Sequence, residues 1–384
     1  MPDRPMKPSR LLARLDAEIA SAVTQVAADC KQAERAGYLA RMGRIDDAKA
    51  VVAALHQRYD QRPHIEVSVW THLVEGLIGH FSDMDPGARQ KIQRAHALST
   101  AAGLKPLRAL SAAWLAHMEY LRVDVDHMKR GVDDALLIAA KDHHSALART
   151  SLVIALALHC GGRSELARPW YAHARNHAAV EGDDLTISAL MHNMAWLRAH
   201  DMRCSLLDGH SAAEDSQHAL LSAESLAHYD ALIGSESLTA LTPILTAQIL
   251  TYRGRAAEAL LLFEANLDQS LAQGMTRLHA DLLADQAWCR LQLGQAEAAK
   301  RDARAAAESA DVEAHFDDQA LAHGRLALVF RELGDEGAAK LHADKAELAW
   351  AGHRAFCTRL LDAFGALRLP SDLVDSSEPD LTTK

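Results

Sequence analysis

The sequence is poor in residues that interrupt helices and in basic charge. Its 384 residues include only 20 glycines and 10 prolines, which is too little turn-forming material for a protein of many short strands. Lysine and arginine number 41 against 51 aspartates and glutamates, so the formal net charge is -10. An acidic chain is poorly suited to neutralising the phosphates of DNA or RNA. We therefore expect a helical protein that has no nucleic-acid partner.

Long apolar runs, a signal peptide and paired cysteines are also lacking. The longest apolar stretches, near residues 151–158 and 244–250, fall well short of the roughly 20 residues that span a bilayer. Residues 1–8 hold three prolines and lack the apolar core of a signal peptide. The five cysteines are widely separated and form no C-x-x-C pair: Cys30, Cys160, Cys204, Cys289 and Cys357. We expect reduced thiols in a cytoplasmic protein without membrane insertion.

What the sequence does contain is an internal repeat. Residues 252–259, 292–299 and 332–339 align without gaps, and each segment has a glycine followed five residues later by an alanine. The three glycines lie 40 residues apart, and an alanine precedes each of them by seven residues. The same frame extends toward the N-terminus and gives eight units. Their turn positions are Gly43, Asp83, Val123, Gly162, Met202, Gly254, Gly294 and Gly334.

Two of these eight units match the pattern least well, those at Val123 and Met202. From Met202 to Gly254 the spacing rises to 52 residues, so we expect an insertion of about a dozen residues around 203–212. Each unit is predicted to be a helix–turn–helix, because glycine favours the positive φ that often ends a helix. Four alanines are predicted to lie where two helix axes approach closely: Ala167, Ala259, Ala299 and Ala339. A single hairpin cannot bury its apolar face, so the units are expected to stack as a solenoid.

The pattern resembles the tetratricopeptide repeat (TPR) superfamily over residues 28–350. The match consists of the small residue in the first helix, the turn glycine, the alanine five residues later, an aromatic or small residue at nine (Tyr171, Phe263), and a small residue at twelve. The period of about 40 exceeds the family's 34, and the closing proline is absent from almost every unit. The resemblance implies an all-α, right-handed α-α superhelix that serves as a binding scaffold rather than as an enzyme. Long-period relatives resemble the sensor segments of large bacterial regulators and the cargo-binding repeats of motor light chains.

The ends of the chain differ from the repeats. We expect disorder in residues 1–8, a single solenoid over residues 9–368 that includes capping helices, and a disordered acidic tail in residues 369–384. Ser9 is predicted to cap a first amphipathic helix that covers one end of the stack. A closing helix is predicted over residues 355–367.

The resemblance also implies that the first helix of each unit lines a concave inner wall. Counting back from the turn positions places eleven candidate partner-binding residues there: Trp70, His80, Trp114, His117, Tyr120, His159, His192, Asn193, Trp196, Gln248 and Tyr252. Trp and Tyr often anchor interfaces, although tryptophans such as Trp70 and Trp114 could instead fill the hairpin cores. Leu77, Arg149, His200, Asp285, Trp288, Gln292 and Arg325 fall on the same predicted wall. Because Asn193 has no lysine beside it, a chaperone-tail clamp is disfavoured.

Candidate chemical sites are few. His173 and His177 are four residues apart, a spacing suited to two metal ligands on one helix face, but no third ligand is evident nearby. Adjacent His143 and His144 point to different sides of a helix. Three acidic residues near a helix start are read as capping groups rather than as an acid–base pair: Glu181, Asp183 and Asp184. The neighbours His159 and Cys160 do not by themselves indicate a dyad.

Three functions stay open. The first is a non-enzymatic scaffold that binds a protein or peptide in its concave groove, with no cofactor and no metal. The second is a regulatory sensor that binds a small molecule or signal peptide and changes its superhelical pitch. The third is an enzyme or a metal-binding protein that uses the central histidines.

Overall fold

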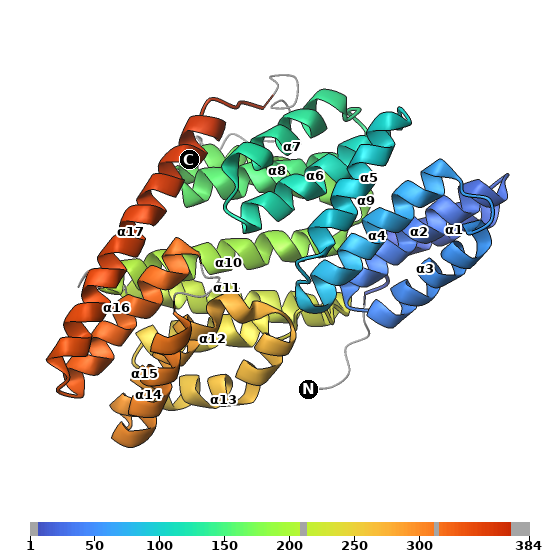
Figure 1. Cartoon of the computed structure of the whole chain (residues 1–384). Helices are drawn as coiled ribbons and strands as arrows, with labels where there is room; N and C mark the ends of the chain where they lie inside the picture. Colours follow the sequence, from blue (N-terminus) through green and yellow to red (C-terminus); the bar gives the residue numbers. More distant parts are fainter. Residues whose placement is uncertain (1–6, 208–212, 311–314, 370–384) are drawn as a thin grey trace, which may run out of the picture.

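The computed structural model describes residues 7–207, 213–310 and 315–369, and it consists of α-helices packed in sequential pairs (Figure 1). These residues form seventeen α-helices and one 3-10 helix, η1 (Met275–Leu278), without a β-strand. Most of the two terminal segments predicted to be disordered, 1–8 and 369–384, lies outside the described residues. Every helix in the described part of the chain is too short or too polar to cross a membrane.

The α-helices, in chain order, are α1 (Arg10–Ser21), α2 (Gln25–Met42), α3 (Ile45–Tyr59), α4 (Ile65–Asp83), α5 (Ala88–Ala101), α6 (Lys105–Leu121), α7 (Val125–Ile138), α8 (His144–Cys160), α9 (Ser164–Glu181), α10 (Asp184–Leu207), α11 (Ala213–Ile233), α12 (Leu241–Tyr252), α13 (Ala256–Ala272), α14 (His279–Gln292), α15 (Ala296–Ser309), α16 (Phe316–Glu332) and α17 (Glu336–Phe364).

The helices from α2 to α17 form eight successive hairpins, which confirms the predicted number of units and the all-α solenoid. The turn glycines of five units have positive φ, from 72° at Gly254 to 95° at Gly43. In the two remaining turns described, Val123 and Met84 adopt the left-handed conformation, with φ of 60° and 53°. The turn after α4 therefore centres one residue beyond the predicted Asp83.

Two sequence predictions about helix ends were wrong. Met202 does not form a turn, because no glycine or proline interrupts the chain there and α10 continues to Leu207. The rest of the predicted insertion, residues 208–212, lies outside the described residues. The closing helix expected at 355–367 is the end of α17, which runs unbroken for 29 residues. Gly352 does not break this helix, and its missing side chain leaves room for the ring of Phe316.

Other predictions about local structure are confirmed. The hydroxyl of Ser9 caps α1 by accepting a hydrogen bond from the Leu12 amide at 3.2 Å. Leu11 and Leu15 of α1 are buried against residues of α2, α10 and α11. The four close-packing alanines are at most 2% exposed: Ala167, Ala259, Ala299 and Ala339. A methyl group at these points lets the two helices of a hairpin approach closely.

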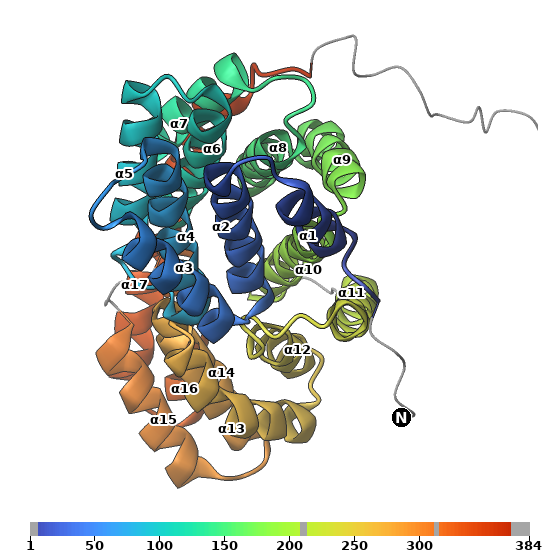
Figure 2. The same ribbon diagram turned by 90° about the vertical axis from the view of Figure 1, so that its right-hand side faces the viewer.

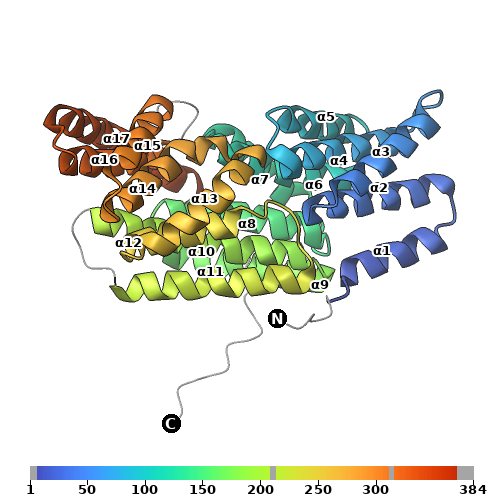
Figure 3. The ribbon, with the colours of Figure 1, turned by 90° about the horizontal axis from the view of Figure 1, so that it is seen from below.

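The row of hairpins curls back until its two halves touch (Figures 2 and 3). The turn of the first unit meets the α11–α12 connection, where the Glu236 amide donates to the Met42 carbonyl at 2.8 Å. Farther along, His315 Nε2 donates to the Leu121 carbonyl at 2.7 Å across 194 residues. The Cys357 thiol donates to the Cys160 carbonyl at 3.1 Å across 197 residues. We name these contacts the closure contacts, because they join the turns of early units to segments of late ones.

Candidate ligand pocket

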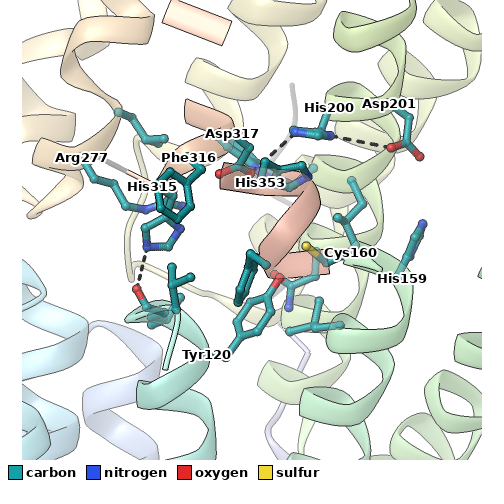
Figure 4. A pocket seen from close by; sticks show the side chains of 18 of the residues that line it. Tyr120, His159, Cys160, His200, Asp201, Arg277, His315, Phe316, Asp317 and His353 are labelled. Atoms are coloured by element: carbon teal, nitrogen blue, oxygen red, sulfur yellow. Dashed lines mark hydrogen bonds and ion pairs between the residues drawn. The ribbon is translucent and has the colours of Figure 1, made fainter. Parts of the chain in front are cut away.

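A pocket of about 300 Å³ lies on the inner side of the curl, where helices from five hairpins meet (Figure 4). Five of the eleven predicted partner-binding residues line it: Tyr120, His159, His192, Asn193 and Trp196. The structure adds residues that the sequence analysis did not place on the inner wall: Cys160, Asp201, Arg277, His315, Asp317, His353 and Phe356. The pocket therefore depends on both halves of the chain.

One wall of the pocket is a face of α10. His192, Trp196 and His200 are spaced by four residues and therefore point to the same side of this helix. The rings of His192 and Trp196 are stacked, with centroids 6.3 Å apart and planes inclined by 29°. Burial lowers the pKa of His192 to about 4. At neutral pH its uncharged ring can donate one hydrogen bond and accept another.

The opposite wall, formed by η1 and the start of α16, carries charge and faces His200 of the α10 wall. His200 Nε2 lies 3.6 Å from Asp317 Oδ2, and Arg277 pairs with the buried Asp318. Burial alone would lower the pKa of His200, but hydrogen bonds with Asp201 and Cys204 outweigh it and raise the pKa. Burial alone would raise the pKa of Asp317, yet the neighbouring histidines lower it. The pocket thus presents a cation at His200 and an anion at Asp317 beside the uncharged rings of His192 and Trp196.

A cluster of soft donor atoms lies at one edge of the same pocket. The donor atoms of Cys160, His353 and Cys357 all lie within 4.8 Å of one another. Cys357 Sγ is 3.3 Å from His353 Nε2. We call these three residues the Cys2His cluster.

Two predicted residues, Gln248 and Tyr252, lie in a buried polar network farther along the inner wall. The members of this inner ion network are Arg203, Gln248, Tyr252, Asp281, Asp285 and Arg325. Asp285 accepts from Arg203 at 3.1 Å and from Arg325 at 2.8 Å, and it is fully buried. The guanidinium of Arg325 lies 4.2 Å from the centre of the Tyr252 ring. These side chains contact one another rather than line the pocket.

The remaining predicted residues gather between α4, α6 and α8. His80, Trp114 and His117 make edge-to-face ring contacts, and the Arg149 guanidinium lies 3.9 Å from the centre of the Trp114 ring. Trp114 is only 4% exposed and belongs to the apolar core. It therefore fills a hairpin core, which was the alternative to a partner-binding role. Half-buried Trp70 lines a separate cavity of about 60 Å³.

The other residues considered as chemical sites from the sequence make hydrogen bonds within the fold. His177 Nε2 is 3.1 Å from His173 Nε2, and its Nδ1 is 2.7 Å from His144 Nδ1. Asp183 accepts from the Thr186 amide at 2.9 Å, which confirms its capping role. His159 contacts the Tyr171 hydroxyl at 3.2 Å, a partner other than the neighbouring Cys160.

Comparisons with known proteins leave the family open, because no family model and no curated protein matches this chain.

Proposed function

We propose that this chain is a non-enzymatic, TPR-like sensor that holds a small polar molecule in the pocket between α6, α8, α10, α16 and α17. The observation that carries this proposal is the position of the pocket at the junction of early and late hairpins. A ligand bound there touches both halves of the curl, so its binding energy favours one degree of closure over others. In this proposal, an attached or associated protein would detect ligand binding as a change in the closure of the curl.

The size and chemistry of the pocket indicate the class of ligand. Its volume of about 300 Å³ is at the small end of the range for small-molecule sites. His192 and Trp196 offer a stacked aromatic surface, Asn193 offers an amide, and the His200–Asp317 pair offers both charges. We infer a small planar or zwitterionic molecule, which the side chains would hold by stacking and hydrogen bonds. The reduced cysteines agree with a cytoplasmic setting.

A protein partner lying along the whole concave face is the alternative role. It receives less support, because the inner ion network and the side chains around Trp114 (His80, His117 and Arg149) pack against one another inside the fold. To reach those side chains, a partner would have to separate paired charges and leave them buried without compensation, which is costly. A short signal peptide could still place its terminal residue in the pocket.

A ligand screen tests the sensor proposal. The full chain is heated with amino acids, nucleosides and short peptides, and a true ligand is expected to raise the melting temperature in proportion to the logarithm of its concentration. The double variant His192→Ala with Trp196→Ala should lose this shift and keep its helicity by circular dichroism. Trp70→Ala is the matched control, because it removes an indole outside the pocket. A protein partner captured equally by the wild type and the double variant, with no small ligand detected, would refute the proposal.

A further inference from the structure

The C-terminal helix α17 and a helix from the middle of the solenoid, α8, bring three metal-type donors together. His353 and Cys357 lie four residues apart on α17 and so share one face of this helix. Cys160 is the last residue of α8, and α17 packs against α8. Gly161 makes this contact possible, since a Cβ there would come within 2.7 Å of the Leu361 side chain. The three donors therefore meet because of the closure of the curl.

We propose that Cys160, His353 and Cys357 bind a zinc ion that clamps α17 to the end of α8. Tetrahedral zinc bonds of about 2.0–2.3 Å place neighbouring ligand atoms roughly 3.3–3.8 Å apart. The Cys357–His353 separation of 3.3 Å already fits, and all three atoms lie within 4.8 Å of one another. A small side-chain adjustment completes the three-ligand set.

The donor chemistry selects the metal. Thiolate and imidazole ligands suit zinc, whereas calcium and magnesium require oxygen ligands. Zinc binds the thiolate form of each cysteine and the uncharged imidazole through a ring nitrogen, so binding displaces to solvent whatever proton a thiol still carries. Cys160 and His353 both line the pocket, so the fourth position faces the cavity and is filled by water or by an exchangeable ligand. The site stands whether or not the pocket also takes the proposed sensor ligand.

The site differs from the histidine pair indicated by the sequence. His173 and His177 lie on α9 and interact with His144 and Ser151. Among the described residues, the groups of three donor atoms within 4.8 Å do not include them. The Cys2His cluster has the thiolates that the histidine pair lacks, and it joins two helices rather than two turns of one helix.

A zinc titration tests the site. Reduced protein freed of metal with a chelator is titrated with zinc against a chromogenic competitor. Separately, cobalt(II) is added, and thiolate coordination appears as a near-ultraviolet charge-transfer band. We expect one zinc per chain, a cobalt band, and a higher melting temperature with zinc. Cys160→Ser and Cys357→Ser should each weaken zinc binding by about 100-fold or more and abolish the cobalt band.

The matched control is Cys204→Ser. Cys204 follows His200 by four residues on α10, with Sγ 3.7 Å from the imidazole Nδ1, which repeats the local arrangement of His353 and Cys357. This variant should bind zinc within about twofold of the wild type. If a cysteine variant is poorly helical, His353→Gln supplies the same test on a folded chain.

Three results would overturn the assignment. The first is less than stoichiometric zinc uptake by reduced wild-type protein. The second is equal affinity in the wild type, Cys357→Ser and His353→Gln. The third is a Cys160–Cys357 disulfide, found by non-reducing peptide mapping of freshly purified protein, together with no zinc uptake after reduction.

Discussion

In most hairpins the first helix buries more of its surface than the second. In the seventh unit, α14 is buried at every residue from Ala280 to Ala287, whereas α15 buries only Ala299, Ala303 and Ala306. The same contrast separates α8 from α9 in the fourth unit. First helices are enclosed by second helices on one side and by the curl on the other. Charges on first helices must therefore be paired, whereas second helices bury one face and leave the other exposed.

The largest test of this contrast removes a paired charge from a first helix. Asp285→Ala leaves Arg203 and Arg325 buried without their shared carboxylate. We expect the free energy of unfolding to fall by about 3–5 kcal/mol, as measured by denaturant titration. The control is Glu258→Ala on α13, where the pair with Arg255 is exposed and no measurable change is expected. Similar losses in both variants would remove the distinction between the two kinds of helix.

A second test uses pH. His80 on α4 is buried beside His117 and Arg149, and burial first, then Arg149, lowers its pKa from 6.5 to about 4. The unfolded chain then binds more protons between these values, so stability is complete above pH 6.5 and declines as the pH falls toward 4. We expect a loss of about 2 kcal/mol from His80 between pH 7 and pH 5.

His80→Phe should make that decline shallower by the same amount, as measured by denaturant titrations at the two pH values. The contribution of His117, whose pKa is also lowered by burial, persists in this variant. An unchanged pH slope in His80→Phe would show that His80 does not contribute to the acid sensitivity of the fold.

A smaller effect is expected at the packed stripe of a second helix. Ala299→Leu inserts three carbons at a fully buried position and should cost about 1–3 kcal/mol through overpacking. Ala305→Leu is the control, because Ala305 lies on the exposed face of the same helix, α15. Differential scanning calorimetry should show a lower melting temperature for the first variant alone. An unchanged melting temperature for Ala299→Leu would contradict its assignment as a close-packing position.

The smallest effect is expected at the turn between a first and a second helix. Gly294 has φ of 75°, and a Cβ there would meet no atom within 4 Å. Gly294→Ala therefore tests backbone conformation alone and should cost about 1 kcal/mol, as measured by denaturant titration. A loss much larger than this would mean that the turn makes contacts which the geometry does not include.

Local features of the fold could be predicted from the sequence, whereas the pocket could be predicted only in part. The 40-residue spacing of small residues and turn glycines placed eight hairpins, because a hairpin is specified by residues close in the chain. The same counting placed His192, Asn193 and Trp196 on a wall of the pocket. The prediction of a turn at Met202 was wrong, because no residue there favours a turn and α10 continues through it.

The opposite wall could not be predicted because it depends on the closure contacts. His315, Asp317 and His353 reach the pocket only where late segments meet early turns. The repeat pattern carries no signal for this meeting, which joins residues almost two hundred positions apart. Arg203 shows the same limit, since the repeat frame assigned it to an insertion and the structure pairs it with Asp281 and Asp285.

During synthesis, Leu121 leaves the ribosome 194 residues before His315, its hydrogen-bond partner. Ordinary repeat arrays assemble progressively, since each repeat needs only its neighbours. In this protein the third and fourth turns stay incomplete until His315 and α17 arrive, and such distant pairings slow folding. The docking of α17 is therefore the concluding event of assembly, and a nascent chain halted before it would expose surfaces that chaperones recognise.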